Sequence, residues 1–206
     1  MNIRLLPTLL AAASLLLAGC LPESKNPLST PQTSRIDVDL EGVYLPGNLR
    51  PDDSSLSTMH FHYRAKRVDG LIQHTNVLDM LEITHEVDSG LITHAYRLLT
   101  TRIGDQNYMS FQDLGKSGVH ATTYTFARYE IGWRGTLRVW LINSEAVAEA
   151  IHAGKLHGTV KPVKYQSQYP EIMITDSTEQ LAAFVKASDP KKLFAGKPMV
   201  LKRITP

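Results

Sequence analysis

The stretch Met59-His60-Phe61-His62-Tyr63-Arg64-Ala65-Lys66 alternates apolar and polar side chains with a period of two. This alternation is typical of a β-strand with one buried face, because successive strand side chains point to opposite sides of the sheet. Asp69-Gly70 follows directly, and this pair is typical of a two-residue hairpin turn with positive φ. The sequence therefore predicts an antiparallel hairpin in which Met59, Phe61 and Tyr63 share one face.

More strands of the same kind follow, and helical periodicity occurs only late in the chain. The expected strands are 78–87, 91–101, 107–112, 122–131 and 136–142, separated by glycine-bearing turns, with short strands at 156–161, 172–175 and 199–204. The expected helices are 144–153, capped by Asn143 or Ser144, and 178–187, where Ser177 and Gln180 have capping-box spacing. These elements predict a mainly β (α+β) fold: a curved antiparallel sheet or small lipocalin-like barrel, with two short C-terminal helices covering an open end.

The amino terminus has the pattern of a secretory signal peptide. Arg4 precedes an uncharged apolar run over 5–18, which contains Pro7 and is too short for a typical membrane-spanning helix. The run ends in Leu17-Ala18-Gly19-Cys20, which resembles the lipobox of bacterial lipoproteins. In that family a peptidase cleaves before the cysteine, whose sulfur carries a diacylglycerol and whose amino group is acylated. The resemblance implies that residues 1–19 are a lipoprotein signal peptide and that Cys20 is lipidated.

The residues after Cys20 predict how the protein is held in the cell envelope. In Gram-negative lipoproteins an Asp after the cysteine favours the inner membrane; Leu21 here implies the outer membrane, with the domain facing the periplasm. Residues 20–35 combine the lipidated cysteine with a stretch rich in Pro, Ser and Thr, which predicts a flexible tether. Residues 36–206 then form a single β-rich domain. Its organisation is similar to the small-barrel domains of uncharacterised bacterial lipoproteins.

Composition excludes several classes of protein. The 206 residues are 43% hydrophobic, enough for a core, and they contain one cysteine, which excludes an internal disulfide framework and a Cys-based zinc site. The formal net charge of +2 argues against a nucleic-acid partner. No cofactor is expected beyond the covalent lipid on Cys20.

Catalytic motifs are incomplete, so no catalytic residue is assigned. Gly115-Lys116-Ser117 resembles the end of a phosphate-binding loop, but Ser110 occupies the position where that motif requires glycine, and we expect a turn. Neither a His-Glu-x-x-His nor a Gly-x-Ser-x-Gly motif occurs.

Four histidines are possible metal ligands. His60 and His62 share one strand face, about 7 Å apart. His85 and His94 flank the turn Asp88-Ser89-Gly90. A two-residue loop would place these two imidazoles side by side; a three-residue loop, which Gly90 favours, would point them to opposite faces. The competing interpretation is that all four are solvated strand residues.

Six cationic residues are candidates for contact with an anionic surface, such as lipid phosphates, lipopolysaccharide or a partner protein. Arg64 and Lys66 extend the polar face of the first strand, and the others are Lys161, Lys164, Lys191 and Lys192. Residues 36–113 carry six more acidic than basic residues, and residues 114–206 carry six more basic than acidic residues. A basic end results only if the C-terminal segments fold together, since interleaved halves would neutralise each other.

These features predict a lipid-anchored cell-envelope protein that acts as a non-enzymatic binding or envelope-assembly module. The alternative is a lipocalin-like carrier whose barrel holds a small apolar ligand. A third hypothesis is a hydrolase built from residues scattered along the chain. The expected partners are the membrane, through the anchor, and an envelope protein, a lipid or an apolar small molecule.

Overall fold

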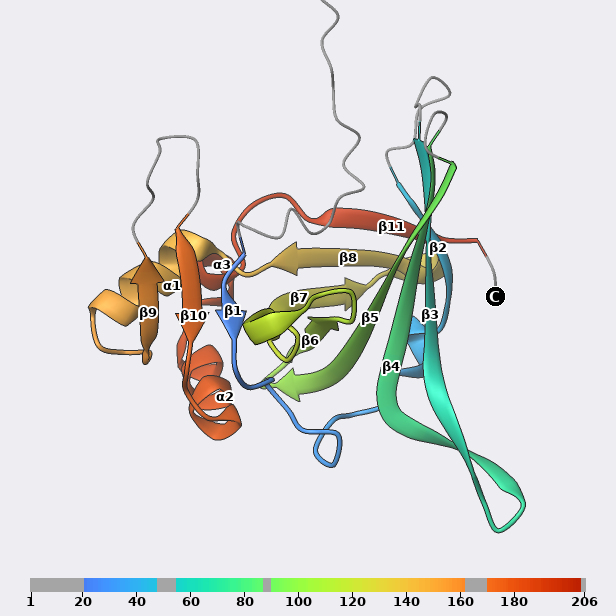
Figure 1. The fold of residues 1–206 in the computed structure, drawn as a ribbon, viewed down its shortest axis with the longest axis horizontal. Helices are drawn as coiled ribbons and strands as arrows, with labels where there is room; N and C mark the ends of the chain where they lie inside the picture. Colours follow the sequence, from blue (N-terminus) through green and yellow to red (C-terminus); the bar gives the residue numbers. More distant parts are fainter. Residues whose placement is uncertain (1–20, 48–54, 87–89, 162–169, 205–206) are drawn as a thin grey trace, which may run out of the picture.

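The protein is a closed eight-stranded antiparallel barrel with a helical insert (Figure 1). The computed structural model describes residues 21–47, 55–86, 90–161 and 170–204. The barrel strands are β2 (Gly42–Pro46), β3 (Ser55–Val68), β4 (Leu71–Glu86), β5 (Gly90–Ile103), β6 (Gln106–Asp113), β7 (Thr125–Ile131), β8 (Thr136–Leu141) and β11 (Met199–Arg203). Strands β2 to β8 follow one another around the wall, and β11 closes it between β8 and β2. The predicted small barrel is confirmed.

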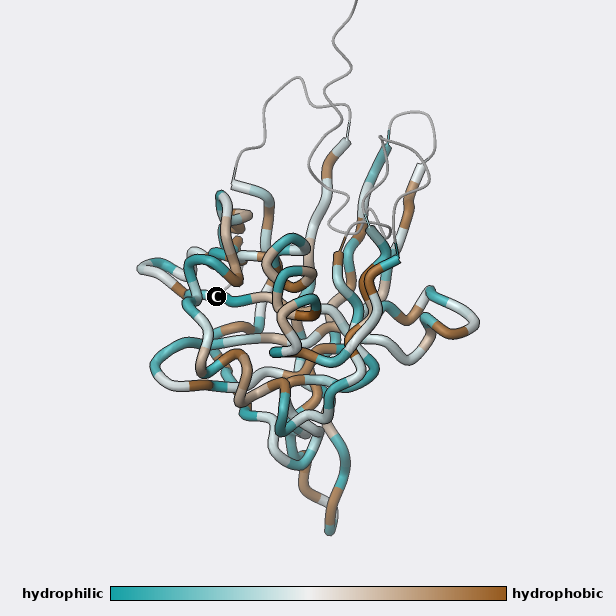
Figure 2. Tube along the Cα trace, turned by 90° about the vertical axis from the view of Figure 1, so that its left-hand side faces the viewer, coloured by the Kyte–Doolittle hydropathy of each residue, from teal (hydrophilic) through white to brown (hydrophobic). Residues whose placement is uncertain are grey.

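The hairpin of β3 and β4 forms as predicted and extends beyond the barrel. Met59, Phe61 and Tyr63 are buried, and the turn residues Asp69 and Gly70 have φ values of 50° and 81°. Figure 2 shows the alternation of hydrophilic and hydrophobic residues along the strands. Beyond a register shift between Tyr63 and Ala65, the two strands continue as a ribbon with exposed side chains. We call residues 65–74 the hairpin tip, which projects at the lower right of Figure 1.

The barrel core is aromatic, and one end of the barrel is closed by the chain itself. The rings of Tyr44 and Phe61 pack in a T-shaped arrangement, with 5.3 Å between ring centroids. The short 3-10 helix η1 (Val38–Leu40) inserts the fully buried Leu40 into this core. Beside it the Tyr129 hydroxyl donates to Asp37 Oδ2 at 2.7 Å, and the Asp37 amide donates to the Tyr63 hydroxyl at 2.7 Å. We call this the closed end.

A helical insert connects β8 to β11. It contains α1 (Ser144–His152), β9 (Gly158–Lys161), β10 (Glu171–Ile174), α2 (Thr178–Ala187) and α3 (Pro190–Leu193). The Asn143 side chain caps α1, and Ser177 and Gln180 form the predicted capping box of α2. Helix α3 was not predicted; Asp189 caps it, and proline at its first position suits a helix start.

The insert does not cover an open end of the barrel, which corrects that expectation. Its core includes Val147, Leu181 and Phe194, which pack with Tyr108 and Phe126. Those two residues alternate with the inward-facing Met109 and Ala127, so they belong to the outer wall of β6 and β7. The helices therefore pack on the outside of the barrel, where an apolar outer face was available to bury them.

The segment predicted as a flexible tether is instead packed on the domain from Leu21 onward. Strand β1 (Glu23–Ser24) pairs in parallel with β10, giving the small sheet β1-β10-β9. The Leu28 amide donates to Ser110 Oγ at 2.9 Å, and the Ser34 hydroxyl donates to the Thr100 carbonyl at 2.8 Å. Residues 31–33 form a turn, and the Thr30 and Thr33 hydroxyls hydrogen-bond each other at 3.2 Å, so polar residues that suggested flexibility are held in a defined structure.

The remaining short elements are two 3-10 helices. Helix η2 (Gly118–His120) lies between β6 and β7, and η3 (Trp133–Gly135) lies between β7 and β8. The residues before η2 form a turn at 114–115, as expected for Gly115-Lys116-Ser117.

Candidate functional site

Two polar groups lie toward the end of the barrel opposite the closed end, which we call the mouth. Here β3 and β5 begin and β4 ends. One group joins the N-terminal segment to the barrel, and the other lies on the inner wall.

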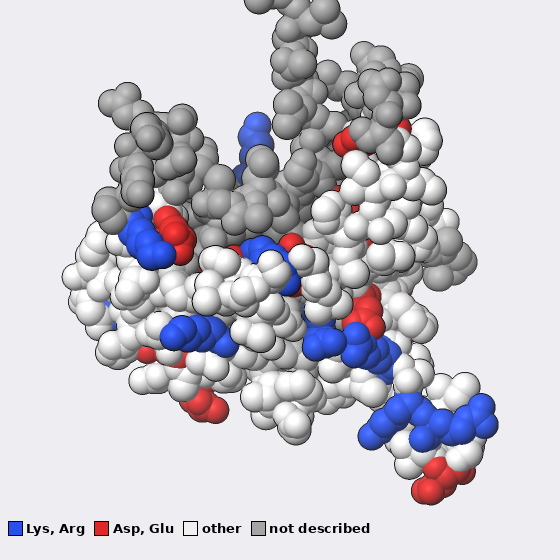
Figure 3. Space-filling view, in the orientation of Figure 1, with Lys and Arg blue, Asp and Glu red and all other residues white. Residues whose placement is uncertain are grey.

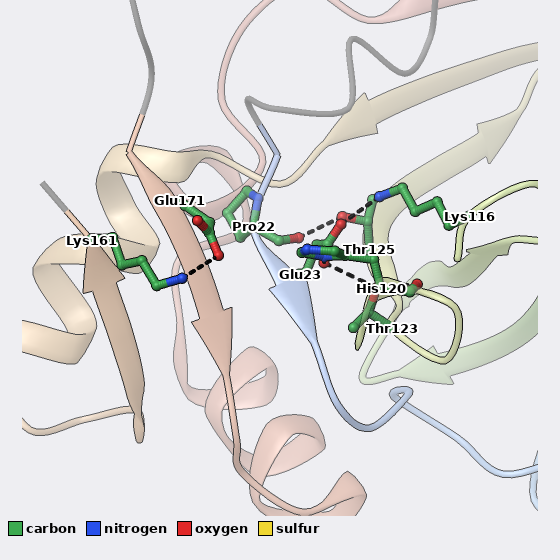
Figure 4. A network of polar contacts seen from close by, with 8 residues as sticks. All are labelled: Pro22, Glu23, Lys116, His120, Thr123, Thr125, Lys161 and Glu171. Atoms are coloured by element: carbon green, nitrogen blue, oxygen red, sulfur yellow. Dashed lines mark hydrogen bonds and ion pairs between the residues drawn. The ribbon is translucent and has the colours of Figure 1, made fainter. Parts of the chain in front are cut away.

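The first group is centred on Glu23, which is 8% exposed (Figure 4). One carboxylate oxygen accepts from Lys116 Nζ, and the other lies 2.5 Å from His120 Nδ1 and accepts from the Thr123 hydroxyl at 3.1 Å. These three partners come from the segment between β6 and β7. We call the four residues the Glu23 clamp.

Opposing effects set the pKa of Glu23. Burial alone raises the pKa of this carboxyl, but hydrogen bonds from Lys116 and His120 and the charge of Lys116 outweigh burial. The net pKa lies below the ordinary value, so Glu23 is a carboxylate at neutral pH. A carboxylate that accepts several hydrogen bonds is a poor proton acceptor, so Glu23 is suited to an ion pair with Lys116 and not to acid–base chemistry.

The chain beside the clamp follows a fixed path. The Thr125 hydroxyl donates to the Pro22 carbonyl at 2.5 Å, and Ser24 and Tyr124 exchange backbone hydrogen bonds of 2.7 and 2.8 Å. A small pocket of about 20 Å³ lies here, lined in part by Leu21, Glu23 and Phe111. This volume suits a water molecule rather than an organic ligand. These contacts fix Pro22, Glu23 and Ser24 on the barrel, directly after Leu21.

The second group lies on the inner wall and includes Glu82, which is only 3% exposed. On neighbouring strands Glu82 is directly opposite Met59 and His94. Because Met59 belongs to the barrel core, this register points Glu82 into the barrel. Its Oε1 atom is buried without a hydrogen-bond partner. Burial raises the pKa of Glu82, and nearby His94 lowers it by a smaller amount.

The four predicted histidine ligands do not come together. Strands β4 and β5 pair in a register that places Glu82 opposite His94 and Glu86 opposite Gly90. His94 therefore points inward and His85 points outward, so the two imidazoles lie on opposite faces of the sheet. The alternative with a three-residue loop predicted that the two imidazoles lie on opposite faces. The observed loop lies one residue earlier in the chain than in that prediction, because residues 87–89, and not 88–90, separate the two strands. His60 contacts the Thr58 hydroxyl at 3.1 Å. His62 Nδ1 lies 3.3 Å from Glu41 Oε1, and its ring centroid is 6.5 Å from that of His74.

Across the described ranges, no cluster of three or more His, Cys, Asp or Glu side chains is arranged to hold a metal ion. The predicted metal site at His60, His62, His85 and His94 therefore has no support in the positions of these residues.

The predicted cationic residues occupy separate parts of the surface. Arg64 forms an ion pair with Asp79 at 2.5 Å at the base of the hairpin tip, and Lys66 lies within the tip, where Figure 3 shows a cluster of basic side chains. Lys161 pairs with Glu171 at 2.8 Å in the insert (Figure 4), and Lys191 and Lys192 belong to α3. The basic residues therefore do not form one end of the molecule.

Two predicted residues lie outside the described ranges: Cys20, the expected lipidation site, and Lys164. Sequence reasoning missed both Glu23 and Glu82. Glu23 lies in a proline-rich stretch with no strand pattern, and its partner Lys116 is 93 positions away. For Glu82, the strand was predicted but not which of its faces would be buried.

Comparisons with known proteins found no match, so the functional proposal is based on the residues of the site. The sequence matches no protein-family model, and it has no significant similarity to a curated protein or to a solved structure. Among the helices in the part of the chain that the structure describes, none is long and apolar enough to cross a membrane.

Proposed function

We propose that the protein is a lipid-anchored envelope protein whose barrel serves as a non-enzymatic binding or assembly module. The sequence Leu17-Ala18-Gly19-Cys20 carries the lipid-anchor part of this proposal. The observation that supports a defined module is the fixed path of Leu21, Pro22 and Glu23 at the mouth. An acylated Cys20 directly precedes this segment, so the anchor would hold the domain close to the bilayer rather than on a long tether.

This arrangement also orients the hairpin tip. In Figure 1, β1 and the hairpin tip lie on opposite sides of the barrel. The tip exposes Lys66 and Arg67, and also Leu71 and Ile72, which are 68% and 70% exposed. A domain anchored through Cys20 in the outer membrane would direct this cationic and apolar tip into the periplasm. We therefore assign the tip as the surface for an anionic envelope partner.

The anchoring experiment compares the full-length chain with its Cys20→Ser variant in a Gram-negative host. Labelled palmitate should be incorporated into the parent chain, which should fractionate with the outer membrane; Cys20→Ser should lose the label and the fractionation. A Ser14→Ala variant, changed outside the lipobox, is the matched control and should behave as the parent. Unchanged labelling or unchanged membrane fractionation of Cys20→Ser would contradict the anchor.

A second candidate function is transport or storage of a small apolar ligand in the barrel. The buried Glu82 favours it, because a polar group facing the inside of a barrel without a partner is a natural contact for a bound molecule. Native mass spectrometry of the chain purified from its host checks this candidate directly. A retained small molecule of defined mass supports the carrier, and a protein that is empty and takes up no apolar probe contradicts it.

A further inference from the structure

The inner wall near the mouth places one acidic group among apolar side chains. Glu82 is flanked along β4 by Met80 and Thr84, and Tyr96 on β5 is directly opposite Met80. Met80 and Tyr96 are 8% and 2% exposed, so this part of the wall is largely shielded from solvent. We call Met59, Met80, Glu82, Thr84, His94 and Tyr96 the mouth wall.

Few groups in the described part of the chain stabilise the negative charge of Glu82, whose Oε1 atom has no hydrogen-bond partner there. The Thr84 hydroxyl is already paired with the Ser57 hydroxyl at 2.7 Å, so it is engaged elsewhere. No Lys or Arg in the ranges that the structure describes forms an ion pair with Glu82. His94, which is directly opposite Glu82 on β5 and lowers its pKa, is itself solvent-exposed. A buried carboxyl oxygen without a partner is unfavourable, so a molecule or ion that supplies a partner would bind here favourably.

We propose that the mouth wall binds an amphiphile with a primary amine head, whose ammonium group pairs with Glu82 and whose apolar body lies against Met59, Met80 and Tyr96. This inference rests on the proposed carrier function and names its ligand class. An ammonium ion donates charge-assisted hydrogen bonds to a carboxylate, which are about twice as strong as neutral ones. Methionine and tyrosine side chains provide a polarizable surface for an alkyl chain and its cationic head.

The same geometry disfavours the ligands usually expected of an apolar carrier. A fatty acid would bring a second carboxylate next to Glu82, and two like charges in a shielded site repel each other. A fatty alcohol would fit the apolar surface and could donate one hydrogen bond to Glu82, but it would bring no positive charge to the carboxylate. The order of affinity should therefore be amine, then alcohol, then acid, for chains of equal length.

The test is isothermal titration calorimetry of the full-length chain carrying Cys20→Ser, with octylamine, 1-octanol and octanoate at pH 7.5. Octylamine should bind at least tenfold more tightly than octanoate. Glu82→Gln should weaken octylamine binding at least tenfold and leave octanol binding unchanged. Glu82→Asp, which keeps the charge, should retain the preference for amine, and Glu149→Gln on the exposed face of α1 should change nothing.

The outcomes separate this inference from the carrier function on which it rests. Equal binding of amine and acid, or octylamine binding that is unaffected by Glu82→Gln, overturns the amine site while the carrier function stands. Failure of all three probes to bind overturns both. Circular dichroism of each variant shows whether the barrel is intact, and Glu82→Asp provides the test if Glu82→Gln does not fold.

Discussion

The carboxylate of Glu23 and the imidazole of His120 lie 2.5 Å apart, although the two residues are separated by 97 positions in the sequence. With Lys116 and Thr123, this contact ties the N-terminal segment to the loop between β6 and β7. The clamp is thus a long-range connection that determines where the segment after Cys20 begins its path. Its strength can be measured independently of any ligand.

Replacing Glu23 by Gln should release the N-terminal segment. The neutral amide offers one acceptor oxygen where the carboxylate uses two, and Lys116 loses its counter-ion. We expect a loss of about 1–3 kcal/mol in the free energy of unfolding, measured by chemical denaturation. Hydrogen exchange of the Ser24 amide, which donates to Tyr124, should accelerate.

The matched control is Glu171→Gln. Glu171 also pairs with a lysine, Lys161, but its side chain is 52% exposed. An exposed ion pair contributes less than about 1 kcal/mol, so the control should remain close to the parent protein. An equal effect of the two substitutions would show that the clamp adds nothing beyond a surface pair.

Acid should weaken the clamp. The folded-state pKa of Glu23 lies below its ordinary value of 4.5, so the unfolded chain takes up the proton first. The stabilisation is complete above the unfolded pKa and is lost as the pH falls through the folded pKa. The difference in free energy of unfolding between the parent and Glu23→Gln should therefore shrink steadily below about pH 4.5. A difference that stays constant down to pH 2 would contradict this assignment.

Glu82→Gln should have the opposite effect on stability. The pKa of Glu82 is higher in the folded protein than its ordinary value of 4.5. The free energy of unfolding therefore falls as the pH rises above 4.5 and the carboxyl loses its proton. Removing the charge should raise the free energy of unfolding at pH 8 by about 1–3 kcal/mol. The gain should disappear near pH 4, where the carboxyl is protonated in both states. Thermal unfolding at the two pH values measures it, and destabilisation at pH 8 would show that Glu82 has a stabilising partner.

Tyr129→Phe should destabilise the closed end. The Tyr129 hydroxyl donates to Asp37 Oδ2 at 2.7 Å, and its removal leaves that oxygen without this donor. Hydrogen bonds to charged groups contribute about 1.5–3 kcal/mol, and we expect a loss of that size in urea denaturation. Tyr108→Phe is the control, because Tyr108 is equally buried but packs in the other core against Phe194. A loss of similar size in both variants would point to packing rather than to the hydrogen bond.

Local sequence signals predicted the elements whose structure depends on neighbours in the chain. The alternation around Phe61 identified the buried face of β3, Asp69-Gly70 identified its turn, and Ser177 with Gln180 identified the start of α2. Each of these signals acts over a few residues, where strand periodicity, positive φ and capping operate.

Contacts between distant segments could not be predicted in the same way. Strand β1 has two residues and forms by pairing with β10, so nothing in residues 21–35 alone distinguishes it from a tether. The inward position of Glu82 depends on the register of β4 against β3 and β5, and a shift by one residue would move it to the outer wall. The sequence thus predicted the barrel but not the positions of Glu23 and Glu82.

The closure of the barrel by β11 also bears on how the chain acquires its structure as it folds. Tyr44 and Arg203 meet across 159 positions, so the wall stays incomplete until β11 is free to pair with β2 and β8. Until then β2 and β8 each present an unpaired strand edge, which is prone to association with other chains. Non-local closure of this kind is slow. The folding chain should therefore remain open and dependent on chaperone protection until β11 is in place.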